Sequence, residues 1–102
     1  MVPMIESRKE ELFALCRQYN VRKLELFGSA ARGAFDPQTS DLDFLVEYAR
    51  LETGSRADSY FGLLFGLEDL FNRGIDLVVT SAISNPYFLR SIAQDRLVLY
   101  AA

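Results

Sequence analysis

Histidine is absent from this chain, and so is tryptophan. Without histidine there is no imidazole to act as a general base, to complete a nucleophilic triad or to serve in the usual zinc sites. Any catalysis must therefore come from carboxylates, hydroxyls, arginine and lysine. Cysteine occurs once, as Cys16, so no disulfide can form within the chain, and a reducing, cytoplasmic compartment is expected.

Long apolar runs and long basic runs are lacking as well. No stretch approaches the ~20 apolar residues of a membrane-spanning helix, and the N-terminus lacks the apolar core of a signal peptide. The net charge is −3, which argues against a surface that grips nucleic acid. We therefore expect neither a membrane nor nucleic acid as a direct partner. At 102 residues, 50% of them apolar, the chain is expected to form one domain over residues 1–102.

The spacing of apolar residues predicts the helices and strands. Four segments are expected to be helical, one of them about one turn long: residues 4–19, 29–33, 57–72 and 86–95. Four segments are expected to form strands: residues 22–27, 41–48, 75–80 and 97–100. In the helix over 57–72, Phe61 and Phe65 widen the apolar face, and Gly62 and Gly66 lie four apart on one flank. That flank can serve either dense core packing or a partner surface.

Residues 24–46 carry the chemistry that we assign to the chain. Gly28 follows an apolar strand, and glycine allows the sharp turn from a strand into a helix. Ser29 then begins that helix, where free backbone N–H groups, a hydroxyl and the local dipole can hold a phosphate. Arg32 follows one turn later and can reach a phosphate with two hydrogen bonds, although an arginine that is simply solvated is an equally good interpretation. Arg90, in the last helix, is a weaker candidate for the same task.

Two aspartates, Asp41 and Asp43, head the next strand. Residues two apart in a strand share a face, so both carboxylates point the same way, roughly 6–7 Å apart at the backbone. Like charges this close repel unless a cation lies between them, and Mg²⁺ prefers carboxylate and phosphate oxygen. Asp76 heads the third strand and can face this pair if the two strands are neighbours. Such a site suits nucleotidyl transfer with two metal ions, because positioning and charge neutralisation do most of the work.

A glycine–serine turn followed by an Asp-x-Asp strand resembles the signature of the DNA polymerase beta-like nucleotidyltransferase superfamily, in particular its minimal nucleotidyltransferases. The matching residues are Gly28, Ser29, Arg32, Gly33, Ser40, Asp41 and Asp43. The segments GLEDLFNRGIDLVV and NPYFLRSIAQDRLVLY are similar to those of the antitoxin members of that family. The resemblance covers nearly the whole chain.

This resemblance implies an α/β (α+β) nucleotidyltransferase fold, with a small mixed sheet of three to four strands flanked by helices. It implies that Asp41, Asp43 and Asp76 are catalytic and bind two Mg²⁺ ions, and that Gly28, Ser29 and Arg32 hold the phosphates of ATP. It further implies an antitoxin that moves AMP from ATP onto a tyrosine of a partner HEPN-type toxin, with which it forms a hetero-oligomer.

Two other functions remain open from the sequence. The chain could be a binding-only antitoxin with an inactive site, in which Phe61, Phe65 and the glycine flank carry the partner surface. It could instead be a catalytic subunit that modifies a small molecule such as an aminoglycoside, with a separate subunit supplying the pocket. Processing of nucleic acid is disfavoured by the acidic balance of charge.

Overall fold

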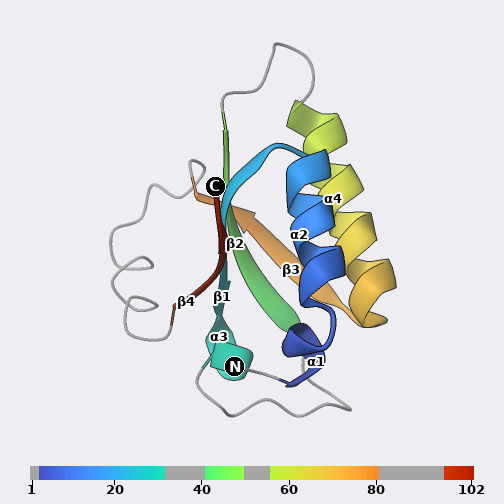
Figure 1. Ribbon diagram of the computed structural model, residues 1–102, viewed down its shortest axis with the longest axis vertical. Coiled ribbons are helices and arrows are strands. Elements are labelled where there is room, and N and C mark those ends of the chain that lie inside the picture. Colours follow the sequence, from blue (N-terminus) through green and yellow to red (C-terminus); the bar gives the residue numbers. More distant parts are fainter. Residues whose placement is uncertain (1–2, 32–40, 50–55, 81–95) are drawn as a thin grey trace.

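The computed structural model describes residues 3–31, 41–49, 56–80 and 96–102, and a four-stranded sheet forms its centre (Figure 1). The strands are β1 (Val21–Phe27), β2 (Leu42–Tyr48), β3 (Ile75–Val79) and β4 (Leu97–Ala101). Their order across the sheet is β3-β2-β1-β4. β1 pairs antiparallel with β2 and with β4, whereas β2 and β3 run parallel. The expected small mixed sheet is confirmed.

The two long helices, α2 (Lys9–Gln18) and α4 (Arg56–Phe71), lie side by side on one face of the sheet (Figure 1). α4 connects β2 to β3, because parallel strands cannot be joined by a tight turn and need a crossover. Two short helices, α1 (Pro3–Glu6) and α3 (Gly28–Ala31), precede α2 and follow β1. The helix expected over residues 86–95 lies outside the described residues. None of the described helices is both long enough and apolar enough to cross a membrane.

The main core lies between the sheet and the helical layer. Alternate strand residues such as Leu24, Phe44 and Val46 are fully buried and meet the buried faces of α2 and α4. Phe44 also stacks on Phe71, with ring centroids 6.1 Å apart. Cys16 is part of this core, and burial raises the pKa of its thiol to about 12. The thiol is therefore protonated and unreactive.

One predicted element, the single helix over residues 4–19, is wrong, because the chain forms α1 and α2 with a break between them. At the break the Ser7 hydroxyl donates a hydrogen bond to the Met4 carbonyl at 3.0 Å, and the Arg8 amide donates to the Ile5 carbonyl at 3.1 Å. A serine side chain that bonds to the local backbone competes with helical hydrogen bonding. The predicted end of this helical segment is confirmed to within one residue, since α2 ends at Gln18 and Asn20 takes a left-handed φ of 59° just after it.

The glycine flank of α4 is occupied by α2. A Cβ atom at Gly66 would lie 2.7 Å from Cδ2 of Leu15, and one at Gly62 would overlap the ring of Tyr19. The two glycines therefore let α4 approach α2 closely, and the interpretation as dense packing is the one that holds. Phe61 and Phe65 point elsewhere and stay 51% and 57% exposed.

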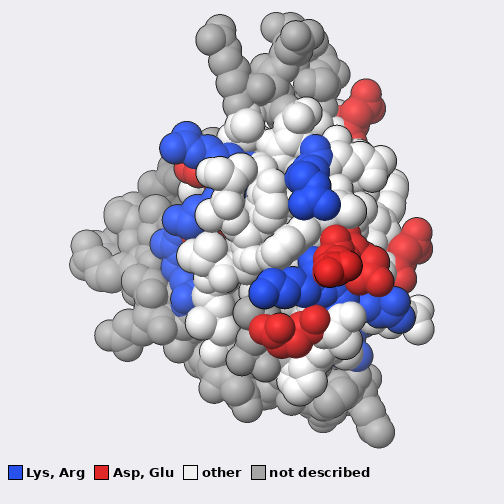
Figure 2. Space-filling view, viewed as in Figure 1, with Lys and Arg blue, Asp and Glu red and all other residues white. Residues whose placement is uncertain are grey.

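Charged side chains are distributed unevenly over the described surface. Figure 2 shows Lys and Arg grouped at its left, on the side of the sheet away from α2 and α4, whereas both signs are mixed over the helices. Cationic side chains on β1 and just before the edge strand β4 include Arg22, Lys23 and Arg96, which are 68%, 40% and 26% exposed. The face of the sheet away from α2 and α4 thus has a basic side.

Candidate active site

A row of residues crosses the sheet on the face away from α2 and α4. Asp43 of β2 stands level with Phe27 of β1 on one side and with Asp76 of β3 on the other. Neighbouring strands lie about 4.8 Å apart, and directly paired residues share a face of the sheet. The side chains of Asp43 and Asp76 therefore project from adjacent strands to the same side. Asp76 is exposed and Asp43 is half-buried. The sequence analysis expected Asp76 to face the other two aspartates if its strand were next to theirs. β3 does lie next to β2, so this requirement is met.

Asp41 comes just before β2 in the chain. In space it lies next to Gly74, in the turn that comes just before β3. The Leu42 amide donates a hydrogen bond to the Gly74 carbonyl at 3.2 Å, which joins the starts of the two strands. A Cβ atom at Gly74 would lie 2.5 Å from Oδ1 of Asp41, so this carboxylate rests against the glycine. Asp41 is exposed. All three predicted aspartates thus lie at the same end of the β2–β3 pair.

Gly28 forms the other wall of the site. Its φ of +73° lies in the left-handed region that favours glycine, and it turns β1 directly into α3. A Cβ atom at this position would overlap the carboxylate of Asp43. The predicted sharp turn is confirmed, and it brings the backbone of Gly28 into contact with Asp43. The side chain of Ser29 and the whole of Arg32 and Arg90 lie outside the described part of the chain, so their phosphate contacts stay predictions.

Carboxylates are the only metal ligands that this site offers among the described residues. No group of three acidic or cysteine side chains there is gathered closely enough to hold a metal ion alone. Mg²⁺, however, is usually held by one or two carboxylates, with substrate phosphates and water completing its shell. The adjacent pair Asp43 and Asp76 therefore fits a hard cation that arrives together with a nucleotide.

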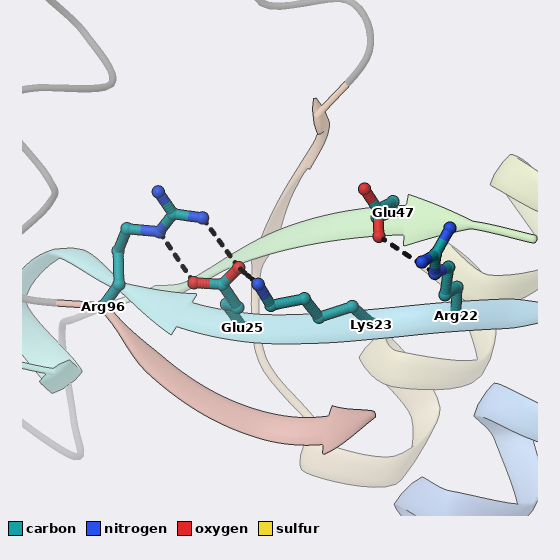
Figure 3. Close-up of polar contacts among 5 residues, drawn as sticks. All are labelled: Arg22, Lys23, Glu25, Glu47 and Arg96. Atoms are coloured by element: carbon teal, nitrogen blue, oxygen red, sulfur yellow. Dashed lines mark hydrogen bonds and ion pairs between the residues drawn. The ribbon is translucent and has the colours of Figure 1, made fainter. Parts of the chain in front are cut away.

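A second polar group on this face, centred on Glu25 of β1, received no role from the sequence. Glu25 is only 5% exposed and accepts two hydrogen bonds of 2.7 Å from Nε and Nη2 of Arg96 (Figure 3). Nζ of Lys23 lies 3.2 Å from the same carboxylate. The Arg96 hydrogen bonds hold the pKa of Glu25 below its ordinary value, and Glu25 in turn raises the pKa of Arg96. Glu25 and Arg96 are therefore both charged at neutral pH.

The strand pattern did contain a signal for Glu25. It lies between inward-facing Leu24 and Leu26, which places it on the same face as the aspartates. The sequence could not show its partner, because Arg96 is 71 positions away and reaches it only through the pairing of β1 with β4.

Acid should weaken the contribution of Glu25 to stability. Because its pKa is lower in the folded chain, its stabilising effect is fully present above its ordinary pKa of 4.5 and is lost as the pH falls through the folded-state value. We expect Glu25→Gln to lower the free energy of unfolding by about 2 kcal/mol at neutral pH. Urea denaturation at descending pH should show this difference shrinking below about pH 4.5.

The matched control for this measurement is Glu47→Gln. Glu47 is 45% exposed and lies 3.7 Å from Arg22, a surface pair of the kind that contributes little. Its variant should differ from the parent by less than about 1 kcal/mol at every pH. A Glu25→Gln deficit that does not change with pH would show that the charge of Glu25 is not what stabilises the fold.

Comparison with known proteins gives a consistent result. A family model described as the nucleotidyltransferase domain matches residues 9–99. The chain is 40% identical over 81 residues to "Putative protein adenylyltransferase MJ0128" of Methanocaldococcus jannaschii, a match that covers 79% of each chain.

Two solved structures are similar to this fold. The structure described as "Structure of putative minimal nucleotidyltransferase" has a TM-score of 0.74 and 27% identity, covering 91% of this chain and 90% of that one. The second structure is of a tri-AMPylated Shewanella oneidensis HEPN toxin in complex with an MNT antitoxin. It has a TM-score of 0.65 and 17% identity, and covers 95% of this chain and 72% of that one. At so low an identity the second likeness concerns the fold alone.

Proposed function

The chain belongs to the family of proteins built on the nucleotidyltransferase domain, and from that premise we propose that it moves an adenylyl group from ATP onto a hydroxyl of a partner protein. The observation that carries the proposal is the pairing of Asp43 with Asp76 opposite the bend at Gly28. Two carboxylates held side by side favour a cation between them, and a cation there would attract the phosphates of a nucleotide. Because Gly28 has no side chain, the carboxylate of Asp43 can lie against the backbone at this bend.

The reaction joins the acceptor oxygen to the α-phosphorus of ATP and breaks the bond to the bridging oxygen, so that pyrophosphate leaves with the bonding electrons. In our proposal Asp41, Asp43 and Asp76 hold two Mg²⁺ ions, which when bound supply charge neutralisation at the phosphates. Gly28 and Ser29 position the terminal phosphates, and Arg32 adds a cation. Asp76 also accepts the proton of the acceptor hydroxyl; it is exposed on an edge strand, which leaves it open to an incoming partner.

For the acceptor we propose a tyrosine of a HEPN-type toxin, which would make the chain an antitoxin. Support comes from the relative named as a protein adenylyltransferase and from the Shewanella oneidensis complex, in which an MNT antitoxin is bound to a tri-AMPylated HEPN toxin. The resemblance of residues 85–100 to antitoxin members of the family points the same way.

The decisive experiment supplies the purified chain with Mg²⁺, with ATP labelled at the α-phosphate, and with a purified HEPN-type toxin as the candidate partner. We expect label on a tyrosine of that protein and none when Mg²⁺ is chelated. Label that appears on an aminoglycoside without any protein acceptor would favour the small-molecule alternative. Neutralisation of the partner without any transfer of label would favour an antitoxin that acts by binding alone.

One feature of α4 favours partner binding as a second function. Phe61 and Phe65 stack on each other with ring centroids 6.0 Å apart, and both are more than half exposed. Exposed aromatic pairs are typical of the centre of protein interfaces. The adjacent glycines do not contribute, because they face α2.

A double variant tests this aromatic pair. Phe61→Asp with Phe65→Asp should weaken capture of the toxin by at least about tenfold, because two charges would then be desolvated in the interface. Both side chains are exposed, so the thermal midpoint should stay close to that of the parent. Ala57→Asp, at an exposed position of the same helix, is the matched control and should bind normally. Equal capture of the toxin by all three proteins would exclude this face of α4 from the interface.

A further inference from the structure

In the cluster of Glu25, Arg96 and Lys23, the positive charges outnumber the single carboxylate. Arg96 uses Nε and Nη2 for its two bonds to Glu25, and Lys23 adds a second cation at 3.2 Å. One negative and two positive charges leave the cluster with an excess of one positive charge. In Figure 3 the third guanidinium nitrogen of Arg96, Nη1, points away from Glu25, and the side chain is 26% exposed. Arg96 therefore keeps donors for a further anion.

The buried ion pair between Glu25 and Arg96 is not explained by fold stability alone. Desolvation of the charges often cancels the attraction between them, and apolar residues of similar size can do as well or better. The neighbouring strands are already joined by their backbone pairing. What Glu25 does provide is orientation, since two parallel hydrogen bonds fix the plane of the Arg96 guanidinium.

The position of Arg96 relates this cluster to the acidic pair. Leu97 pairs with Leu26, so Arg96, one residue earlier, lies level with Phe27. Phe27 is the strand partner of Asp43, and Asp76 comes next.

Glu25 and Phe27 are two apart in β1 and share a face, and Arg96 bonds to Glu25, so the cation and the aspartates lie on one side of the sheet. The row runs from cation to carboxylates, with about 10 Å between the backbones of Arg96 and Asp43.

We propose that Arg96 binds the terminal phosphates of the nucleoside triphosphate, and that Glu25 is the positioning residue that presents it. The inference rests on the proposed function. With the α-phosphate at Asp43 and Asp76, the terminal phosphates extend past Gly28, along the end of β1, toward β4. When the bond at the α-phosphorus breaks, the electron pair leaves with pyrophosphate, and the Arg96 guanidinium balances the charge that develops there.

Direct binding measurements on the full chain in Mg²⁺ test this role. Two ligands are compared by calorimetry: α,β-methylene-ATP, which cannot be cleaved at the α-phosphorus, and AMP, which lacks the terminal phosphates. Arg96→Gln should weaken binding of the ATP analogue about tenfold and leave AMP within about twofold. Arg96→Lys should recover part of the loss, because lysine keeps the charge. Glu25→Gln should show a smaller loss, again for the analogue alone.

Arg22→Gln is the control, since Arg22 is an exposed arginine at the opposite end of β1, paired with Glu47. It should bind both ligands as the parent does. The inference is overturned if Arg96→Gln binds the ATP analogue like the parent, or if it loses affinity for AMP to the same degree, which would indicate a purely structural role. If the parent chain binds neither ligand, the proposed function fails and the inference fails with it.

Discussion

Asp43→Asn is expected to lower the rate of adenylyl transfer by about a thousandfold. Asp43 is the central residue of the acidic row, with Asp76 level with it and the Gly28 backbone against its carboxylate. An amide lacks the charge that holds a cation against the phosphates, and that cation supplies several kcal/mol of stabilisation to the transition state. Transfer of label from ATP to the partner protein measures the effect.

The same substitution should leave the fold intact. Asparagine has almost the same size and shape as aspartate, and the loss of repulsion from Asp76 offsets part of any contact that is weakened, so the free energy of unfolding should change by less than about 1 kcal/mol. ATP analogue and Mg²⁺ together should raise the thermal midpoint of the parent but not of Asp43→Asn. Asp69→Asn, an exposed aspartate on α4, should behave as the parent in both assays. Full transfer activity in Asp43→Asn would refute the assignment of Asp43 as a metal ligand.

The strands and the long helix α4 could be predicted to within a residue at each end, because their patterns are strong. β2, for example, was expected over residues 41–48 and spans Leu42–Tyr48, with alternate residues in the core. The break between α1 and α2 could not be predicted in this way. The apolar stripe skips one turn, at Arg8 and Lys9 between Ile5 and Leu12, but one skipped turn is common in helices, and the pattern does not show that the Ser7 hydroxyl bonds to the Met4 carbonyl.

The acidic part of the site was predictable for a similar reason. A glycine at the end of a strand and two aspartates two residues apart can be recognised in the local sequence. The parallel pairing of β2 and β3 then brings Asp43 and Asp76 together. The basic part was not predictable. Arg96 meets Glu25 only because β4 pairs with β1 in one particular register, with an irregularity between Leu24 and Glu25. Register between distant strands is set by tertiary packing, which a period of two does not reveal.

Gly28→Ala is expected to damage both stability and activity. An alanine at a φ of +73° has a conformational penalty of about 1–2 kcal/mol, and its Cβ would overlap the carboxylate of Asp43. Forcing the two apart adds about 1–3 kcal/mol. The thermal midpoint should fall by about 10 °C or more, and displacement of Asp43 should lower transfer by about a hundredfold even where the protein is folded.

A second glycine provides the matched control for this strain. Gly62→Ala makes the same chemical change and also creates a close contact, with the outer end of the Tyr19 ring, but Gly62 lies within helix α4 and does not have a positive φ. Alanine is favoured over glycine in a helix by about 1 kcal/mol, so this variant carries a steric cost without the φ penalty and should be less destabilised than Gly28→Ala.

Combining Gly28→Ala with Asp43→Ala separates the two costs. The double variant removes the overlap and keeps the unfavourable φ, so the alanine at position 28 should cost only about 1–2 kcal/mol in that background. If it costs the same with and without the Asp43 carboxylate, the two groups do not touch. That result would show that Gly28 does not lie against the Asp43 carboxylate, and it would also contradict the site proposed for the triphosphate.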